Sequence, residues 1–364
     1  MSSETNSTTD SDDLVTSESS GGNDTIDKAV LYLSVFKITI GIIGICGNMM
    51  VLIIMKLQTH KGKFLIRSQA FIDMLTSMAF IADAFTGLYP PTVPQHPIIG
   101  YIYCIVWHYF ATVFVLFSLS TYNLVAISIE RYILVLYPMY YRAYFTRTKE
   151  VLLGVSSWFL APIMQLTYVL SQIFYDNENK TCILILLRRG DILGVFIFVW
   201  DFFIPCLVMG YCFATISVRL YQQDKEAKGL KGHSSIGIES VSGTVSTTAT
   251  SSAGDSNQQK YVVDAKSDDD VQVAGKEESV DEYRRSRNVT KTFIIIFVVY
   301  IFCWITNQLL FLQMNLGGYT HWGRPESHFA NGLAMLNSAC NPFIYVLHMK
   351  QYRDKVRSFF SNGL

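Results

Sequence analysis

The sequence predicts an all-α protein, a seven-transmembrane helix bundle with a short amphipathic helix after the last span. Half of the 364 residues are hydrophobic and only 16% are charged, which is more apolar than a typical soluble chain of this length. Seven apolar runs reach the ~20 residues that a helix needs to cross a bilayer. They lie at about residues 29–55, 63–88, 103–135, 149–171, 190–220, 288–314 and 326–347.

The second and seventh runs are the weakest of the seven, because both carry polar side chains. Asp73 and Asp83 lie in the second run, and Asn331, Asn337 and Asn341 lie in the seventh. Polar groups on a helix in lipid turn toward the interior of a bundle. We therefore expect these side chains to line the inside of the bundle.

Basic residues fix the predicted orientation. Of the 29 lysines and arginines, 23 fall in the segments on one side of the spans, and that side is cytoplasmic by the positive-inside rule. The protein is thus expected in the plasma membrane, as a multi-pass chain with an extracellular N-terminus. Sequons at Asn6, Asn23 and Asn179 fall on the outer side and predict glycosylation there.

One long loop separates the fifth and sixth spans. It contains few aromatic residues, and 11 of the 19 residues from Ser234 to Ser252 are serine or threonine, so it cannot bury a core and is predicted to be disordered. After Leu347, basic and apolar residues alternate at helical spacing, which predicts a helix lying on the membrane lipid. The predicted regions are a disordered extracellular N-terminus (1–28), spans one to five (29–223), cytoplasmic loop 3 (224–286), spans six and seven (287–347), and a cytoplasmic amphipathic helix with a short tail (348–364).

Two motifs place polar or helix-breaking residues at the ends of spans. Glu130-Arg131-Tyr132 closes the third span, and Asn341-Pro342-x-x-Tyr345 closes the seventh. A proline inside a spanning helix frees a carbonyl, and the amide of Asn341 can satisfy it. Charges beside hydrocarbon are costly and mark function or pairing. With these motifs the chain resembles the rhodopsin-like (class A) G-protein-coupled receptors over nearly all of its length outside the N-terminal tail and loop 3.

The resemblance implies a conformational switch at the cytoplasmic end. In the family the arginine pairs with the neighbouring acidic residue at rest, here Arg131 with Glu130, and extends toward a heterotrimeric G protein on activation. Met139 matches the family's apolar contact with that partner. The other residues of the implied switch are Tyr132, Asn341, Pro342 and Tyr345.

The resemblance also implies a sodium ion inside the bundle. Hard cations take oxygen ligands, and a lone buried carboxylate such as Asp73 otherwise loses its charge. The alternative is a hydrogen-bonded structural aspartate without an ion. Asn48 is expected to link the first, second and seventh spans. The implied ligands of this allosteric sodium ion, the only cofactor expected, are Asp73, Ser120, Asn337, Ser338 and Asn341.

Two outer features follow from the same resemblance. Cys104 at the head of the third span and Cys182 in the second outer loop are expected to form a disulfide that shapes the ligand entrance. Trp304 in the sixth span is expected to lie under the ligand and to couple its arrival to helix movement.

The chain departs from the family pattern at four places. Thr306 stands where the sixth span usually has a proline, and Phe213 stands where the fifth span has a tyrosine. No carboxylate lies near Arg287 at the base of the sixth span, so the restraint on Arg131 is expected to be weak. Cys104 and Arg131 are two residues further apart than usual, which leaves the register of the outer third span open.

The charges that are missing narrow the ligand class. Ala111 or Val113, depending on register, stands where amine receptors hold their counter-ion, and Met335 stands at the retinal lysine of opsins. A peptide ligand is favoured, because it makes dispersed contacts instead of relying on one counter-ion. Asp83 and Asp201 either face a cationic ligand group or bond to neighbouring helices. The candidate pocket residues are Asp83, His108, Asp201, Trp304, Asn307, Gln308 and His328.

Together these features predict a ligand-activated receptor that is not an enzyme and has no nucleic-acid partner. A transporter is the main alternative, but the chain shows no internal repeat and its prolines do not pair between halves. A constitutively active receptor without a ligand also stays open, because the sixth span lacks the carboxylate at its base. Arrestin and receptor kinases are expected to use the serine- and threonine-rich part of loop 3, since phosphates there add clustered negative charge.

Overall fold

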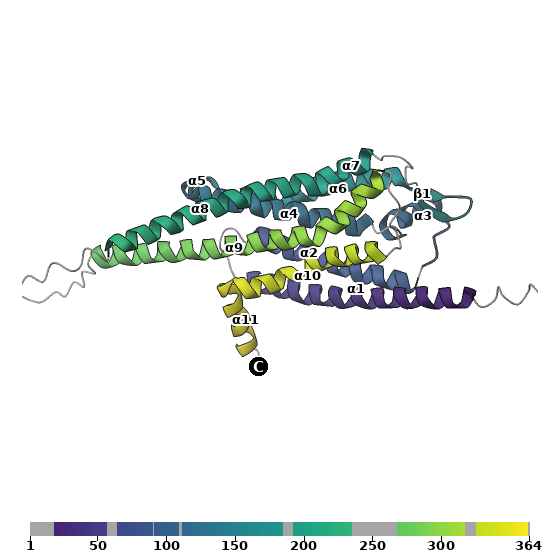
Figure 1. Ribbon diagram of the computed structural model, residues 1–364, viewed down its shortest axis with the longest axis horizontal. Helices are drawn as coiled ribbons and strands as arrows, with labels where there is room; N and C mark the ends of the chain where they lie inside the picture. The colour runs from purple at the N-terminus through teal and green to yellow at the C-terminus, as the bar shows by residue number, and fades with distance from the viewer. Residues whose placement is uncertain are drawn as a thin grey trace, which may run out of the picture.

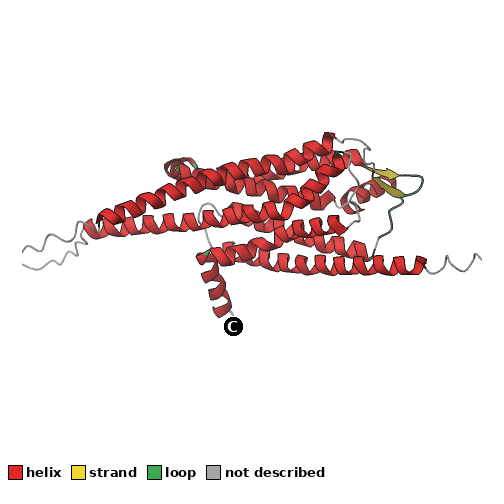
Figure 2. Ribbon diagram, in the orientation of Figure 1, coloured by secondary structure: helices red, strands yellow, loops and turns green. Residues whose placement is uncertain are grey.

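Long helices run side by side along one axis of the molecule in the computed structural model, with a β-hairpin at one end (Figures 1 and 2). The structure describes residues 18–56, 64–89, 91–108, 111–184, 192–234, 268–316 and 325–362. The elements are α1 (Glu18–Lys56), α2 (Phe64–Leu88), α3 (Pro97–Tyr103), η1 (Cys104–His108), α4 (Ala111–Leu136), α5 (Pro138–Tyr144), α6 (Arg147–Gln172), β1 (Ile173–Asp176), β2 (Thr181–Leu184), α7 (Ile192–Phe198), η2 (Val199–Phe203), α8 (Ile204–Ser234), α9 (Asp268–Asn315), α10 (Pro325–His348) and α11 (Lys350–Asn362).

The seven-helix prediction is confirmed. Six segments of the described chain are long and apolar enough to cross a membrane, and α2 has the lowest hydropathy of these six. The seventh helix, α10, has 24 residues, but Asn337, Ser338 and Asn341 make it more polar, and all three are buried. The six apolar segments are Val30–Met55, Phe64–Thr86, Ala111–Leu136, Arg147–Gln172, Ile192–Glu226 and Arg287–Asn315.

The third span is composite, which corrects the single run expected at 103–135. Its outer part is α3 followed by the π-helix η1, and its inner part is α4. A π-helix takes more residues per turn than an α-helix. η1 lies between Cys104 and Arg131, so the extra residues between the two are accommodated at the outer end of this span.

Three helices extend beyond the predicted boundaries. α1 begins at Glu18, inside the segment 1–28, and α8 and α9 reach Ser234 and Asp268, inside loop 3. α8 and α9 project together past the rest of the bundle (Figure 1). A helix that is already formed adds one backbone hydrogen bond per residue, so a polar sequence alone does not end it. Residues 1–17 and 235–267, including Asn6 and most of the serine- and threonine-rich stretch, lie outside the described residues.

The outer end is closed by the hairpin of β1 and β2, which pairs antiparallel with Tyr175 opposite Cys182. The predicted disulfide joins Cys182 to Cys104 at the start of η1. Asn179 lies exposed in the hairpin turn, and its side-chain amide donates to the carboxylate of Asp176 over 2.6 Å. This hydrogen bond, with backbone N–H groups of the turn, lowers the pKa of Asp176. The glycosylation expected at Asn179 stays a prediction.

The starting part of α1 and the helix after α10 also relate to predictions made from the sequence. Asn23 lies within the helical segment of α1. After α10 the chain turns sharply into α11, which points away from the bundle axis (Figure 1). The predicted helix after the last span is therefore confirmed. Its residue Tyr352 is buried and packs near Tyr345 of α10.

Glycine allows α1 to pack closely against its neighbours. A Cβ at Gly44 would lie 2.2 Å from Ser77 Oγ on α2, and a Cβ at Gly47 would lie 2.9 Å from Pro342 Cγ on α10. Membrane helices associate through small residues because lipid supplies no hydrophobic force between them. These contacts set the distance between α1, α2 and α10.

We predict that Gly44→Ala destabilises the protein by about 1–3 kcal/mol, because the added methyl group overpacks the α1–α2 contact. The matched control is Gly210→Ala on α8, where the nearest atom, Phe297 Cζ, would be 3.8 Å away. The control should be neutral or stabilising by roughly 0.5–1 kcal/mol, because alanine favours a helix. Thermal unfolding of both purified variants measures the difference. Equal melting temperatures would contradict the close contact.

Candidate functional site

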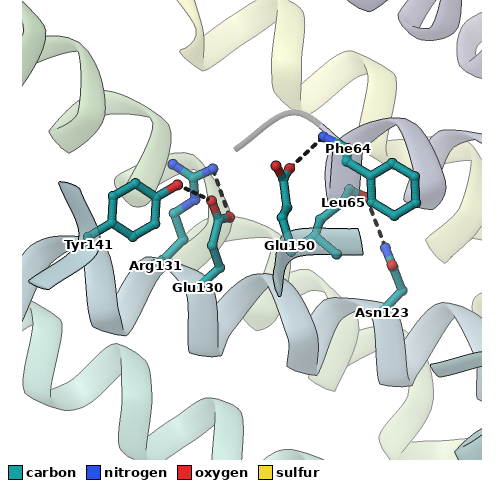
Figure 3. Close-up of polar contacts among 7 residues, drawn as sticks. All are labelled: Phe64, Leu65, Asn123, Glu130, Arg131, Tyr141 and Glu150. Carbon is teal, nitrogen blue, oxygen red and sulfur yellow. Dashed lines mark hydrogen bonds and ion pairs between the residues drawn. The ribbon is translucent and has the colours of Figure 1, made fainter. Parts of the chain in front are cut away.

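A buried ion pair lies at the cytoplasmic end of α4. Arg131 is 5% exposed and Glu130 is 1% exposed, and Arg131 Nη2 lies 3.1 Å from Glu130 Oε2. The hydroxyl of Tyr141 on α5 donates to Glu130 Oε1 over 2.8 Å, as Figure 3 shows. The geometry therefore contains the expected resting pair and adds a tyrosine that holds the carboxylate from the other side. Burial raises the pKa of Tyr141, so its hydroxyl keeps the proton that it donates.

Arg131 reaches α9 through an aromatic ring instead of a carboxylate. Its guanidinium carbon lies 5.7 Å from the centroid of the Phe293 ring. That ring lies 6.2 Å from the ring of Tyr345, which lies 6.1 Å from the ring of Tyr352. The switch residue Arg131 and the motif residue Tyr345 are thus brought together around Phe293.

Arg287, at the start of the membrane-spanning part of α9, has another partner. Arg287 forms two hydrogen bonds with the carboxylate of Asp224 on α8. This pair links α8 to α9, whereas the family's acidic residue would link α9 to Arg131. At the cytoplasmic end of α4, the ring of Tyr132 lies near the rings of Tyr137 and Tyr211 in tilted arrangements. Met139 on α5 is 78% exposed, as a partner contact requires.

A second buried carboxylate near this site was not expected from the sequence. Glu150 on α6 is buried, and its Oε1 accepts the backbone N–H of Phe64 over 2.7 Å (Figure 3). Phe64 begins α2, where N–H groups lack partners within the helix. One turn along α6, a Cβ at Gly154 would lie 2.7 Å from the Phe64 ring. Glu150 and Gly154 together fasten the start of α2 to α6.

The predicted polar cluster forms in the middle of the bundle. Asp73 is fully buried, and its carboxylate accepts from Ser120 Oγ over 3.0 Å and from Asn341 Nδ2 over 2.7 Å. Gln69, which the sequence analysis did not single out, donates to both carboxylate oxygens over 3.1 Å. Gln69 and Asp73 are four residues apart on α2, and this spacing places them on one face and could have identified Gln69.

The donor set of this cluster has the oxygen chemistry that sodium needs, but the arrangement does not fit a bound ion. Each carboxylate oxygen of Asp73 already accepts two hydrogen bonds, which fills the acceptor sites of a carboxylate. Within the part of the chain that the structure describes, Asn337 Oδ1 is buried without a hydrogen-bond partner. Sodium binding at Asp73 stays a prediction, and these contacts of its carboxylate speak against it.

Asn48 satisfies the carbonyl that Pro342 frees. The missing N–H of Pro342 leaves the carbonyl of Ser338, four residues earlier, without its helical partner. Asn48 Nδ2 donates to that oxygen over 2.9 Å and to the oxygen of Gly44 over 2.9 Å. This corrects the expectation that Asn341 does so, because the amide of Asn341 is used by Asp73. The predicted link from α1 to α10 through Asn48 is present.

Both acidic residues of the predicted outer pocket bond to neighbouring helices. Lys37 Nζ on α1 lies 2.5 Å from Asp83 Oδ2. Asp201 in η2 accepts from Ser118 Oγ over 2.6 Å and from Gln165 Nε2 over 2.5 Å. Of the two alternatives for these carboxylates, the structure therefore supports the internal one.

Uncharged groups remain in the outer half of α9. Trp304 is 5% exposed and meets Phe117 edge to face at 4.6 Å. Its Nε1, and Oε1 of Gln308, have no hydrogen-bond partner among the described residues. Asn307 Nδ2 donates to Asn331 Oδ1 over 2.7 Å. The side chains of His108 and His328 lie outside the described residues.

Comparisons with known proteins agree with this geometry. A family model described as "7 transmembrane receptor (rhodopsin family)" matches residues 47–345. A cholecystokinin receptor of Xenopus laevis is 25% identical over 92% of this chain and 77% of its own length. The octopamine receptor beta-2R of Chilo suppressalis is 20% identical over 87% of this chain and 76% of its own. The tachykinin-like peptides receptor 86C of Drosophila melanogaster is 23% identical over 70% of this chain and 44% of its own. Among solved structures, squid rhodopsin is similar with a TM-score of 0.67 and 17% identity, over 92% of this chain and 86% of its own, which shows the fold.

We predict that Glu150→Leu destabilises the protein by about 1–3 kcal/mol, because it leaves the partly buried N–H of Phe64 without its acceptor. Glu150→Gln is the matched variant, since it keeps a side-chain oxygen at the same reach while it removes the charge. In thermal unfolding, the melting temperature should fall clearly for Glu150→Leu and by a smaller amount for Glu150→Gln. Equal losses would mean that charge, and not the helix-start hydrogen bond, explains the buried carboxylate.

Proposed function

Because the chain belongs to the rhodopsin family of seven-transmembrane receptors, we propose that it transmits the binding of an extracellular peptide to a heterotrimeric G protein. Membership of the family makes it a receptor and not an enzyme, and it removes the transporter alternative. The family does not identify the ligand or the G protein, so both rest on the arguments that follow.

The observation that carries the coupling proposal is the buried pair of Arg131 and Glu130. Outward movement of α9 would carry Phe293 away from Arg131, which lies over its ring. The freed guanidinium could then extend toward the cytoplasm, next to the exposed side chain of Met139. The guanidinium of Arg131 beside the apolar side chain of Met139 would form a surface that suits the end of an amphipathic helix of the G protein.

The charges in the outer half of the bundle support a ligand without an essential cationic group. Asp83 and Asp201 are already paired or hydrogen-bonded, and Ala111 and Val113 offer no counter-ion. Trp304 and Gln308 leave one uncharged donor and one uncharged acceptor, which match the amide groups of a peptide. The names of the cholecystokinin and tachykinin-like relatives agree with a peptide, whereas the octopamine receptor is named for an amine. The lack of a free outer carboxylate among these residues favours the peptide.

We propose that loop 3 is the site at which signalling is terminated. Receptor kinases would phosphorylate the stretch from Ser234 to Ser252, and arrestin would bind the resulting clustered negative charge. Action in the plasma membrane, with the N-terminus outside, follows from the distribution of basic residues.

The peptide proposal is tested with a panel of synthetic amidated and free-acid peptides on cells that carry a G-protein dissociation sensor. At least one peptide should activate the intact receptor, and Arg131→Ala should abolish that response at unchanged surface expression. A panel of biogenic amines is run beside it. Activation by amines but not peptides would overturn the peptide assignment, and a normal response of Arg131→Ala would overturn the switch.

We predict that Tyr141→Phe raises basal signalling about fivefold, because losing one hydrogen bond of ~1 kcal/mol weakens the hold on Glu130. Tyr144→Phe is the matched control, since Tyr144 lies on the same helix but is 60% exposed. Basal G-protein dissociation is measured without ligand at equal surface expression. A similar change in both variants would show that Tyr141 does not restrain the arginine.

A further inference from the structure

We infer that the side-chain amide of Gln69 takes the place of a sodium ion in the Asp73 cluster, so that the native chain holds its central carboxylate without a cation. The inference concerns the polar interior of the bundle. It does not depend on the identity of the ligand or on G-protein coupling.

One nitrogen atom makes the contacts that a small cation would make. Gln69 Nε2 lies 2.6 Å from Ser120 Oγ and 3.1 Å from each carboxylate oxygen of Asp73. An amide nitrogen carries two hydrogens. One can point to Ser120, and the other is shared between the two oxygens of Asp73. The positive end of the amide dipole therefore lies where three of the cluster's oxygens converge.

The orientation of this amide is fixed from its other end. Asn123 Nδ2 on α4 donates to Gln69 Oε1 over 2.9 Å and to the backbone oxygen of Leu65 over 3.0 Å. A flipped Gln69 would turn its oxygen toward the carboxylate of Asp73 and its N–H groups toward those of Asn123. Both contacts would be repulsive, so the hydrogen-bond network selects the orientation that donates to Asp73.

A sodium ion would have to compete with these contacts. Ser120 Oγ accepts from Gln69 and donates to Asp73, and the remaining carboxylate contact comes from Asn341. A cation that binds Asp73 and Ser120 must displace the N–H groups of Gln69 from the same lone pairs, and it would leave those groups buried. An unpaired buried donor is costly. The unpartnered oxygen of Asn337 is the atom that a cation would satisfy, so direct measurement must separate the two arrangements.

The experiment measures thermal unfolding of the purified full-length protein in sodium chloride and in potassium chloride of equal concentration. The wild type should melt at the same temperature in both salts. Gln69→Leu removes the amide, keeps much of the volume and leaves the oxygens open. It should melt at a temperature higher by a few degrees, on the order of 2–8 °C, in sodium than in potassium. Adding Asp73→Asn to Gln69→Leu should remove that difference.

Gln222→Leu is the matched control, because Gln222 is an exposed glutamine on α8, and it should behave as the wild type. Gln69→Met is made beside Gln69→Leu, so that a folding failure of one leaves the other to decide. Sodium-23 NMR of the wild type gives an independent readout, and its line width should equal that of the Asp73→Asn variant. The inference would be overturned if the wild type melted at a higher temperature in sodium than in potassium and Asp73→Asn removed that difference. It would also be overturned if both Gln69 variants folded and neither melted at a higher temperature in sodium. If neither variant folds, the wild-type salt comparison and the NMR line width decide alone.

Discussion

The constraint on which this structure depends is that hydrocarbon offers no partner to a polar group. A buried polar group of the spans is therefore stabilised only by a partner inside the bundle, and several contacts between the helices are made by such pairs. Pro342 illustrates this, because the carbonyl that it frees on Ser338 is bonded by Asn48 from another helix. That bond requires α1 to approach α10 closely, and glycine at position 47 makes room for the proline ring.

The same constraint makes α2 the centre of the polar interior. At its start, Glu150 holds the N–H of Phe64, and Asn123 holds the carbonyl of Leu65. One turn later Gln69 joins Asn123 to Asp73, and Asp73 reaches α10 through Asn341. A continuous series of contacts thus connects the cytoplasmic end of α6 with the middle of α10. The side chains and the first turn of α2 therefore link Asn341 on α10 to Glu150 on α6.

Much of this could be predicted from the sequence, and the failures have a common cause. Long apolar runs determine spans almost independently of their surroundings, so the seven-helix bundle was predicted correctly, although the third span is composite. The resemblance to the receptor family is what grouped Asp73, Ser120 and Asn341, and these side chains do meet. The hydrogen-bond partner of a polar side chain depends on which helices pack together, and these helices are far apart in the sequence. For this reason the pairing of Asp83 with Lys37, and of Asp201 with Ser118, stayed open until the fold was known. The π-helix η1 was missed because it uses the same kinds of residues as an α-helix and differs from it only in the spacing of its backbone hydrogen bonds.

The restraint on Arg131 shows how the chain accommodates a missing carboxylate. An acidic residue at the start of the membrane-spanning part of α9 would bind the arginine directly. Here Arg287 lies in that stretch and is paired with Asp224 on α8. Arg131 instead meets α9 through the face of Phe293, a contact worth ~0.5–2 kcal/mol depending on how far water is excluded. A second restraint comes from α5, where Tyr141 orients the carboxylate that the arginine binds. Because α5 also presents Met139 to the cytoplasm, a partner that binds this surface would act on the helix that holds the resting pair. On the proposed function, restraint and partner contact are therefore located on one short helix.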